Sequence, residues 1–117
     1  MANPNIVNVS TIYANTAVVS AGATATTIVA NGAGSNSVYK IDGLYCANND
    51  NASSYLITID LYRSSTAYNV ASAVTIPVGA TLDVLSKQIW LLEGDTLRAT
   101  ANTASKITVV CSYEIIS

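Results

Sequence analysis

Hydrophobic and polar residues alternate along three stretches of the chain: 55–63, 96–101 and 107–115. A side-chain period of two over this length is typical of a β-strand with one buried face. In each stretch the aliphatic residues and alanines fall on one side and mostly polar residues fall on the other. The pattern predicts a core that includes Ile57, Ile59, Leu61, Leu97, Ile107 and Val109.

Residues that favour turns separate these stretches from further apolar segments. Asn102–Ser105 is such a turn, and it predicts that 96–101 and 107–115 form one β-hairpin. Gly43, inside an apolar stretch, indicates a β-bulge or a close backbone approach. Helical spacing with caps is absent from the sequence. We therefore expect an all-β, antiparallel β-sandwich of the jelly-roll or immunoglobulin-like type, with about eight strands.

A chain of 117 residues is the size of one domain. We divide it into an N-terminal arm or strand, residues 1–15, and a single sandwich domain, residues 16–117. Within the first part, the segment 5–14 mixes aliphatic residues with Asn, Ser and Thr. This composition predicts a strand or arm that pairs with another chain segment.

Charged residues make up only 10% of the chain, and the formal net charge is −2. This predicts no binding to nucleic acid, because no basic patch is available for phosphates. No apolar run approaches the roughly 20 residues that span a bilayer, so no membrane association is expected. The N-terminal residues lack the pattern of a secretory signal peptide. A weakly charged surface keeps molecules apart poorly, which fits a subunit of an assembly as well as an ordinary soluble domain.

The sequence offers no catalytic, cofactor-binding or metal-binding constellation. Histidine is absent, which removes the Ser-His-Asp and Cys-His nucleophile pairs and most transition-metal sites. Asp42, Asp60 and Asp83 alternate outward on predicted strands and are expected to be solvated. Cys46 and Cys111 are predicted to be reduced thiols in the core, with a disulfide between them as the alternative.

All the aromatic residues are Tyr or Trp, with no Phe. Such side chains suit surfaces that are partly apolar and partly wet, as at protein interfaces and sugar sites. Tyr62 shares the polar face of its predicted strand and is a candidate surface anchor. The predicted interface residues are Ile6, Val7, Val9, Tyr62 and Trp90.

A set of short motifs carries a family resemblance. The motifs are Tyr39-Lys40-Ile41, the strand 57–62, the segments 77–82 and 92–98, and the closing stretch 109–114. In this order they resemble small virion structural proteins of tailed phages that infect marine bacteria, including cyanobacterial phages. The Glu-Gly-Asp turn at 93–95 and the Ser-Tyr-Glu at 112–114 are the most specific parts. The resemblance implies a β-sandwich without enzymatic activity, carried on the virus particle, and it supplies no functional residues.

Together these observations predict a non-enzymatic virion protein, assembled in the host cytoplasm, that acts as a capsid decoration or cement protein. Its expected partners are the major capsid protein or other virion proteins and its own copies, with a trimer as the first expectation. Sheet faces and the N-terminal arm would make these contacts. A tail, neck or fibre component is the alternative within the same class. A carbohydrate-binding module is the alternative of another class, and it would need exposed coplanar aromatic rings beside polar groups.

Overall fold

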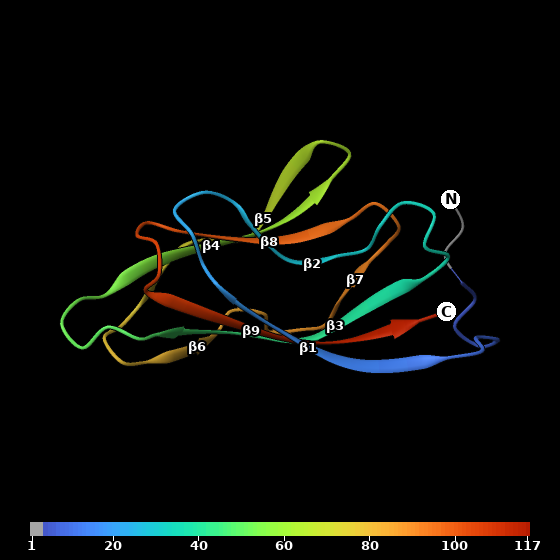
Figure 1. The fold of residues 1–117 in the computed structure, drawn as a ribbon, viewed down its shortest axis with the longest axis horizontal. Coiled ribbons are helices and arrows are strands. Elements are labelled where there is room, and N and C mark those ends of the chain that lie inside the picture. Colours follow the sequence, from blue (N-terminus) through green and yellow to red (C-terminus); the bar gives the residue numbers. More distant parts are fainter. Residues whose placement is uncertain (1–3) are drawn as a thin grey trace.

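A computed structural model describes residues 4–117, and over this range the chain forms nine β-strands and no helix (Figure 1). No helix able to cross a membrane is therefore found in the described part. The strands are β1 (Ile12–Ser20), β2 (Thr26–Ala30), β3 (Val38–Asn48), β4 (Tyr55–Arg63), β5 (Thr66–Ile76), β6 (Thr81–Asp83), β7 (Ile89–Leu91), β8 (Thr96–Ala101) and β9 (Ile107–Ile116).

The strands form two antiparallel sheets that pack face to face. The first sheet has the order β1-β9-β3-β6, and β7 pairs with another part of β3. The second sheet has the order β2-β8-β4-β5. In Figure 1 the second sheet lies above the first, and the sandwich is elongated, with extents of 49 × 26 × 20 Å. The all-β antiparallel sandwich predicted from the sequence is confirmed, with nine strands instead of about eight.

The core lies between the sheets and follows the alternation of the sequence. Along β8 every second residue is buried, and β9 begins in the same way. Of the predicted core residues, five are fully buried and Leu61 is partly buried against them. The bulge expected at Gly43 is present, because the register of β3 against β9 shifts between Ile41 and Gly43. The local pattern therefore identified the buried faces correctly.

The hairpin predicted for the last two strands is wrong. Strand β8 pairs with β2 and β4, whereas β9 pairs with β1 and β3, so the two strands lie in different sheets. The connection between them crosses from one sheet to the other, and Ser105 within it adopts a left-handed backbone conformation (φ 67°). Alternation shows which face of a strand is buried, but it does not show which strand is its neighbour. Strands β8 and β9 both have one buried face, and for this reason their sequences were interpreted as one hairpin although they lie in facing sheets.

The N-terminal strand begins later than the segment 5–14 suggested. Asn5 opens a turn, in which its Oδ1 accepts a hydrogen bond from Val7 N and its carbonyl accepts one from Asn8 N. Strand β1 starts at Ile12, so the predicted division at residue 15 falls inside a strand that is paired with β9. Asparagine favours such turns because its side chain can bond to the backbone two residues on. The described residues that precede the first strand are those before Ile12.

Candidate interaction surface

The five predicted interface residues do not come together in one place. Ile6 and Val7 are 54% and 85% exposed, and Val9 is partly buried. Tyr62 is partly buried on the outer face of the second sheet, and Trp90 is partly buried beside Lys40 on the outer face of the first. The structure therefore offers three separate patches instead of one surface.

The outer face of the second sheet carries an ion pair covered by an aromatic ring. Arg98 Nε donates to Asp60 Oδ1 at 2.9 Å, and the Arg98 guanidinium lies 4.0 Å from the centre of the Tyr62 ring. Asp60 is 5% exposed, so the expectation that this carboxylate is solvated is wrong. A charge can be buried here because a paired, hydrogen-bonded partner compensates it. Tyr62 thus has one ring face already occupied, which limits it as an anchor for a partner.

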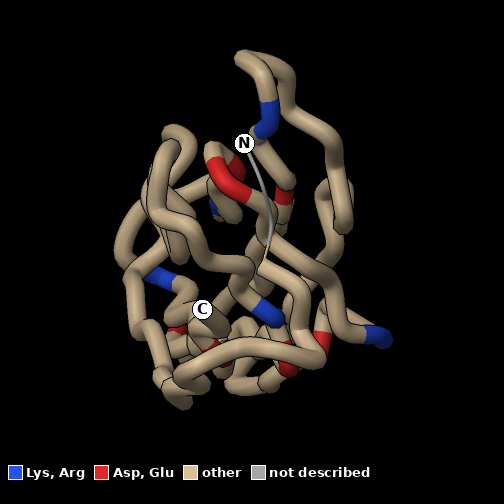
Figure 2. The backbone as a smooth tube through the Cα atoms, turned by 90° about the vertical axis from the view of Figure 1, so that its right-hand side faces the viewer, with Lys and Arg blue, Asp and Glu red and all other residues tan. Residues whose placement is uncertain are grey.

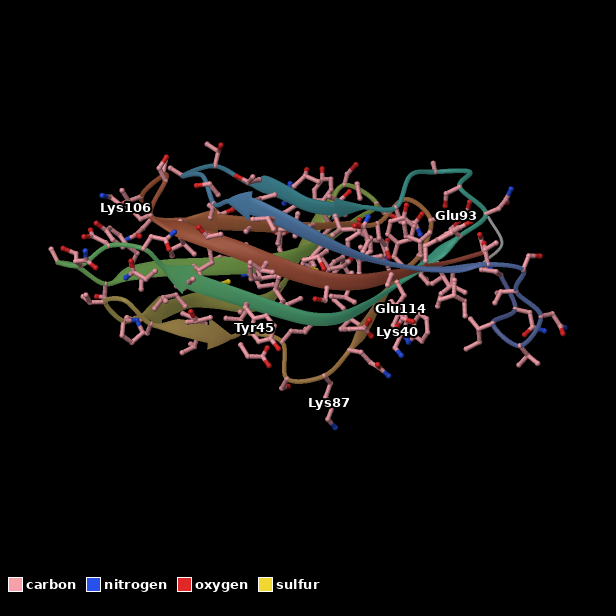
Figure 3. The ribbon with its side chains drawn as sticks, turned by 60° about the horizontal axis from the view of Figure 1, so that its bottom comes forward. Lys40, Tyr45, Lys87, Glu93, Lys106 and Glu114 are labelled. Atoms are coloured by element: carbon pink, nitrogen blue, oxygen red, sulfur yellow. The ribbon has the colours of Figure 1, made fainter. Side chains whose placement is uncertain are left out.

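Asp42 and Asp83, by contrast, are exposed as expected. On the outer face of the first sheet Lys40 Nζ lies 3.7 Å from both Asp42 and Glu114 carboxylates. Figure 3 shows Lys40 and Glu114 side by side on this face, with Tyr45 farther along β3. Exposed pairs of this kind contribute little stability. Lys40 offsets one of the two negative charges, so a single net negative charge remains in this cluster.

An apolar row crosses the same face beyond these charges. Val18, Val110 and Tyr45 stand side by side on β1, β9 and β3 through the registers Val18–Val110 and Tyr45–Val110. Val18 is 64% exposed and Tyr45 is 44% exposed. The Tyr45 ring lies over Gly43, where an added Cβ would sit 3.5 Å from it. The row is a small exposed apolar patch, and the interface residues predicted from the sequence do not include it.

The charged residues are unevenly distributed along the chain. Lys40 is the first residue with a charged side chain, so residues 1–39 carry none. In space the charged positions are spread over both sheets and their loops, and acidic and basic residues are interspersed (Figure 2). The uncharged N-terminal third includes exposed Ile12, Tyr13 and Val18 on β1 as well as Ile6 and Val7. The missing charges are a sequence signal that sets residues 1–39, which include β1, apart from the rest of the chain.

Buried polar side chains close one end of the sandwich and explain the Glu-Gly-Asp motif. Asp95 is 1% exposed; its carboxylate accepts two hydrogen bonds from Arg63 and one from Leu92 N. The bond to Asp95 also raises the pKa of Arg63. Asn31 lies beside Asp95 and donates to the carbonyls of Ser37 and Leu91 at 2.9 Å. Both carboxylate oxygens of Asp95 thus have partners within the sandwich, so this residue of the motif holds the end of the fold together.

The other end is closed in a related way. Asn48 Nδ2 donates to the carbonyls of Ser53 and Ile76, which fixes the polar loop after β3 against the end of β5. In that loop the Tyr55 hydroxyl donates to Asp50, and this hydrogen bond lowers the pKa of Asp50 and raises that of Tyr55. No group of three or more potential metal ligands occurs among the described residues.

The two cysteines lie in the core as free thiols. Burial raises the pKa of Cys46 to about 12 and that of Cys111 to about 12. A thiol with such a pKa stays protonated at neutral pH, and the thiolate is the nucleophilic form. Neither cysteine is therefore suited to catalysis.

Two of the aromatic residues, Tyr39 and Tyr113, form a stack. The rings of Tyr39 and Tyr113 stack on each other, with centroids 5.7 Å apart and an interplanar angle of 17°. Asn15 Nδ2 donates to the Tyr113 hydroxyl at 3.0 Å. Each of these rings uses one face for the other, whereas a sugar platform requires rings that lie side by side with free faces.

Comparison with known proteins shows a similar fold in a solved structure but assigns no family. No known protein family matches the chain, and no curated protein matches it. A subunit of Bacillus endospore appendages, described as a novel family of disulfide-linked pili, matches with a TM-score of 0.57 and 19% sequence identity. This match covers 100% of the present chain and 94% of the pilus chain, and at this identity it shows a common fold alone.

Two crystal structures of a pentameric capsid protein isolated from metagenomic phage sequences are also similar, with 26% identity and TM-scores of 0.45 and 0.44. They align with 86% of the present chain, which spans only 61% and 59% of the two capsid chains. At these TM-scores they do not establish a shared fold. The chain is thus similar in fold to a subunit of the endospore appendages.

Proposed function

We propose that this chain is a non-enzymatic structural subunit of a tailed-phage particle, and specifically a capsid decoration or cement protein. It would bind the major capsid protein or other virion proteins, together with further copies of itself. The sequence resemblance to small virion structural proteins supports this proposal. The physical support comes from the exposed, uncharged N-terminal segment before β1.

That segment is the observation that carries the proposal. Val7 is 85% exposed and Ile6 is 54% exposed, in a stretch that contains no charged side chain. The segment is tied to the sandwich through Ser10 N and Thr11 N, which both donate to the Ser117 carbonyl at 2.9 Å. Fully burying a Val or Ile side chain contributes about 1.5–3 kcal/mol, so this segment gains stability when a neighbouring surface covers it.

The mechanism is adhesive. The segment before Ile12 leaves its turn, extends, and either adds to the edge of a neighbour's sheet or packs its aliphatic side chains into a neighbour's surface. The sheet faces would supply the remaining contact area, since stable protein interfaces bury about 800 Å² on each partner. The side chains on the outer faces offer few unpaired charges to oppose such burial.

Deleting residues 1–9 tests the role of the segment. The deletion keeps Ser10 and Thr11, and therefore keeps their hydrogen bonds to Ser117. We expect the sandwich to remain folded, with an unchanged circular dichroism spectrum, and binding to phage capsids to weaken by at least about tenfold because the aliphatic contact is lost.

Two sets of substitutions show whether the deletion acts by removing the apolar side chains or by removing the backbone of the segment. Replacing both Ile6 and Val7 with Ser should weaken capsid binding, whereas replacing Val78, an exposed valine at the turn after β5, with Ser should not. Capsid co-sedimentation measures both. Capsid binding that is as tight without residues 1–9 as with them would show that the arm is not the adhesive element.

Locating the protein in a cryo-EM map of the intact particle distinguishes decoration from the alternative of a tail, neck or fibre component. A monomer that is absent from purified particles but binds glycans would instead favour the carbohydrate-binding alternative.

A further inference from the structure

The free edge of β1 presents an uninterrupted row of backbone hydrogen-bonding groups. All nine residues of β1 pair with β9 in one continuous register, without a bulge. Thr11 and Ser117 exchange hydrogen bonds at one end, and Ala21 N donates to the Ile107 carbonyl at the other. In an antiparallel ladder these bonds involve every second residue, so the odd-numbered residues of β1 bond to β9. The backbone groups that point away belong to Ile12, Ala14, Thr16, Val18 and Ser20.

The other sheet edges carry features that oppose strand pairing. Strands β6 and β7 are three residues long each. The register of β2 shifts between Thr27 and Val29. Strand β5 is longer, but its register shifts twice and Ala73 within it has a φ of 48°. Short strands and bulges are the usual devices that prevent edge-to-edge association. Among the described strands β1 is the long edge that has neither.

The β1 edge also lacks charge, which is a further common protection of edges. Its first five residues, Ile12–Thr16, are all exposed, so other parts of the described chain do not cover them. We propose that β1 is a dimerisation edge. The β1 strands of two copies pair antiparallel about a two-fold axis at Thr16, and this joins the first sheets of the two copies into one continuous sheet.

The side chains of β1 fit this pairing. A two-fold axis at the central residue, Thr16, uses the whole strand and places Val18 opposite the partner's Ala14, and Ile12 opposite the partner's Ser20. Each contact sets a large side chain against a small one on the outer face. On the opposite face Tyr13, which is 62% exposed in the single copy, comes next to the partner's Val19. Aromatic and β-branched residues are a favourable cross-strand combination.

A second copy of this chain is the occupant that the charges favour. In a two-fold contact each surface meets itself, so any charged residue near the axis would face its own like charge. No residue before Lys40 carries a charged side chain, which removes this repulsion. The Thr16 N–H is held by Asn15 Oδ1 at 2.8 Å in the single copy, and pairing transfers it to the Thr16 carbonyl of the partner subunit. Two-fold pairing gives an even number of copies and would replace the trimer expected from the sequence.

Analytical ultracentrifugation of the full chain and of Thr16→Lys tests the proposal. We expect a concentration-dependent dimer for the full chain and at least a tenfold higher dissociation constant for the variant, because two lysines would face each other at the axis. Val18→Lys should act in the same direction. The matched control is Thr81→Lys, which places the same new charge at an exposed position on β6, at the opposite side of the same sheet, and should leave the dimer unchanged.

Amide hydrogen exchange then locates the contact. Raising the protein concentration should slow exchange at Ile12, Ala14 and Val18 in the full chain but not in Thr16→Lys. A chain that stays monomeric at about 1 mM, or a dimer that Thr16→Lys leaves intact, would overturn the proposal. Loss of the dimer on deletion of residues 1–9 would also overturn it, since the arm and not β1 would then be the contact. Capsid binding by a dimer-deficient Thr16→Lys would show that the proposed function stands independently of this edge.

Discussion

Ile59 fills the centre of the core, and replacing it with alanine tests the packing of the two sheets. Ile59 is 0% exposed, and its direct neighbours within the sheet are Ala99 on β8 and Ala71 on β5. Ile59 is therefore the one large side chain in this row, and the residues on either side of it are alanines. An alanine there would leave three small residues side by side, and the backbone of a paired central strand cannot easily move to fill the space.

The expected loss of stability follows from this environment. Truncation of a buried isoleucine to alanine costs about 2–5 kcal/mol, and the cost rises with the volume of the remaining cavity. Because small neighbours limit the collapse of the site, we expect about 3–5 kcal/mol for Ile59→Ala. For a domain of this size the melting temperature should fall by roughly 10–20 °C.

Urea unfolding followed by the fluorescence of Trp90, the single tryptophan, measures this loss. The matched control is Leu56→Ala, in the same strand but on the opposite face, where Leu56 is 37% exposed. The control should cost about 1 kcal/mol or less, and neither variant should change the slope of the unfolding free energy with urea. If Ile59→Ala destabilises the protein no more than Leu56→Ala, the assignment of the β4 faces and of the core is wrong.

Three further predictions concern buried ionisable groups. Replacing Asp95 with Asn should cost about 1–3 kcal/mol, because the buried Asp95 carboxylate would no longer form its charged hydrogen bonds with the partly exposed Arg63. In the same thermal melt Asp42→Asn, at an exposed site, should have almost no effect. At pH 8 a thiol reagent should label neither Cys46 nor Cys111 in the folded protein and both in urea; labelling of neither in urea would indicate a disulfide. Burial raises both thiol pKa values from 9.0 to about 12. The free energy of unfolding should therefore be unaffected by the thiols below pH 9, and it should decrease as the pH rises from about 9 toward 12, because the unfolded chain loses these protons first.

The sequence by itself determined the strand content and the buried faces. Period-two alternation depends only on neighbouring residues, so it correctly placed Ile57, Ile59 and Val109 in the core. Gly43 signalled its bulge for a similar reason, since a glycine inside a strand removes the side chain that would otherwise pack. These properties are local, and they can be read without knowing which strands are neighbours.

Only the tertiary structure decided the strand partners and the fate of the charged groups. The separation of β8 and β9 into two sheets depends on contacts with β2, β4, β1 and β3, which lie far away in the sequence. In the same way, Asp60 alternates with buried residues and looked solvated, yet Arg98 from β8 covers it.

The same distinction between local pattern and tertiary structure applies to the proposed interaction surface. The sequence indicated an uncharged, apolar N-terminal segment, but whether a strand lies inside a sheet or at its edge depends on the complete strand order. The order β1-β9-β3-β6 leaves one side of β1 unpaired among the described strands. That position, and not the composition of the strand, turns its backbone into a surface that another chain can bind, because an edge strand has hydrogen-bonding groups without partners.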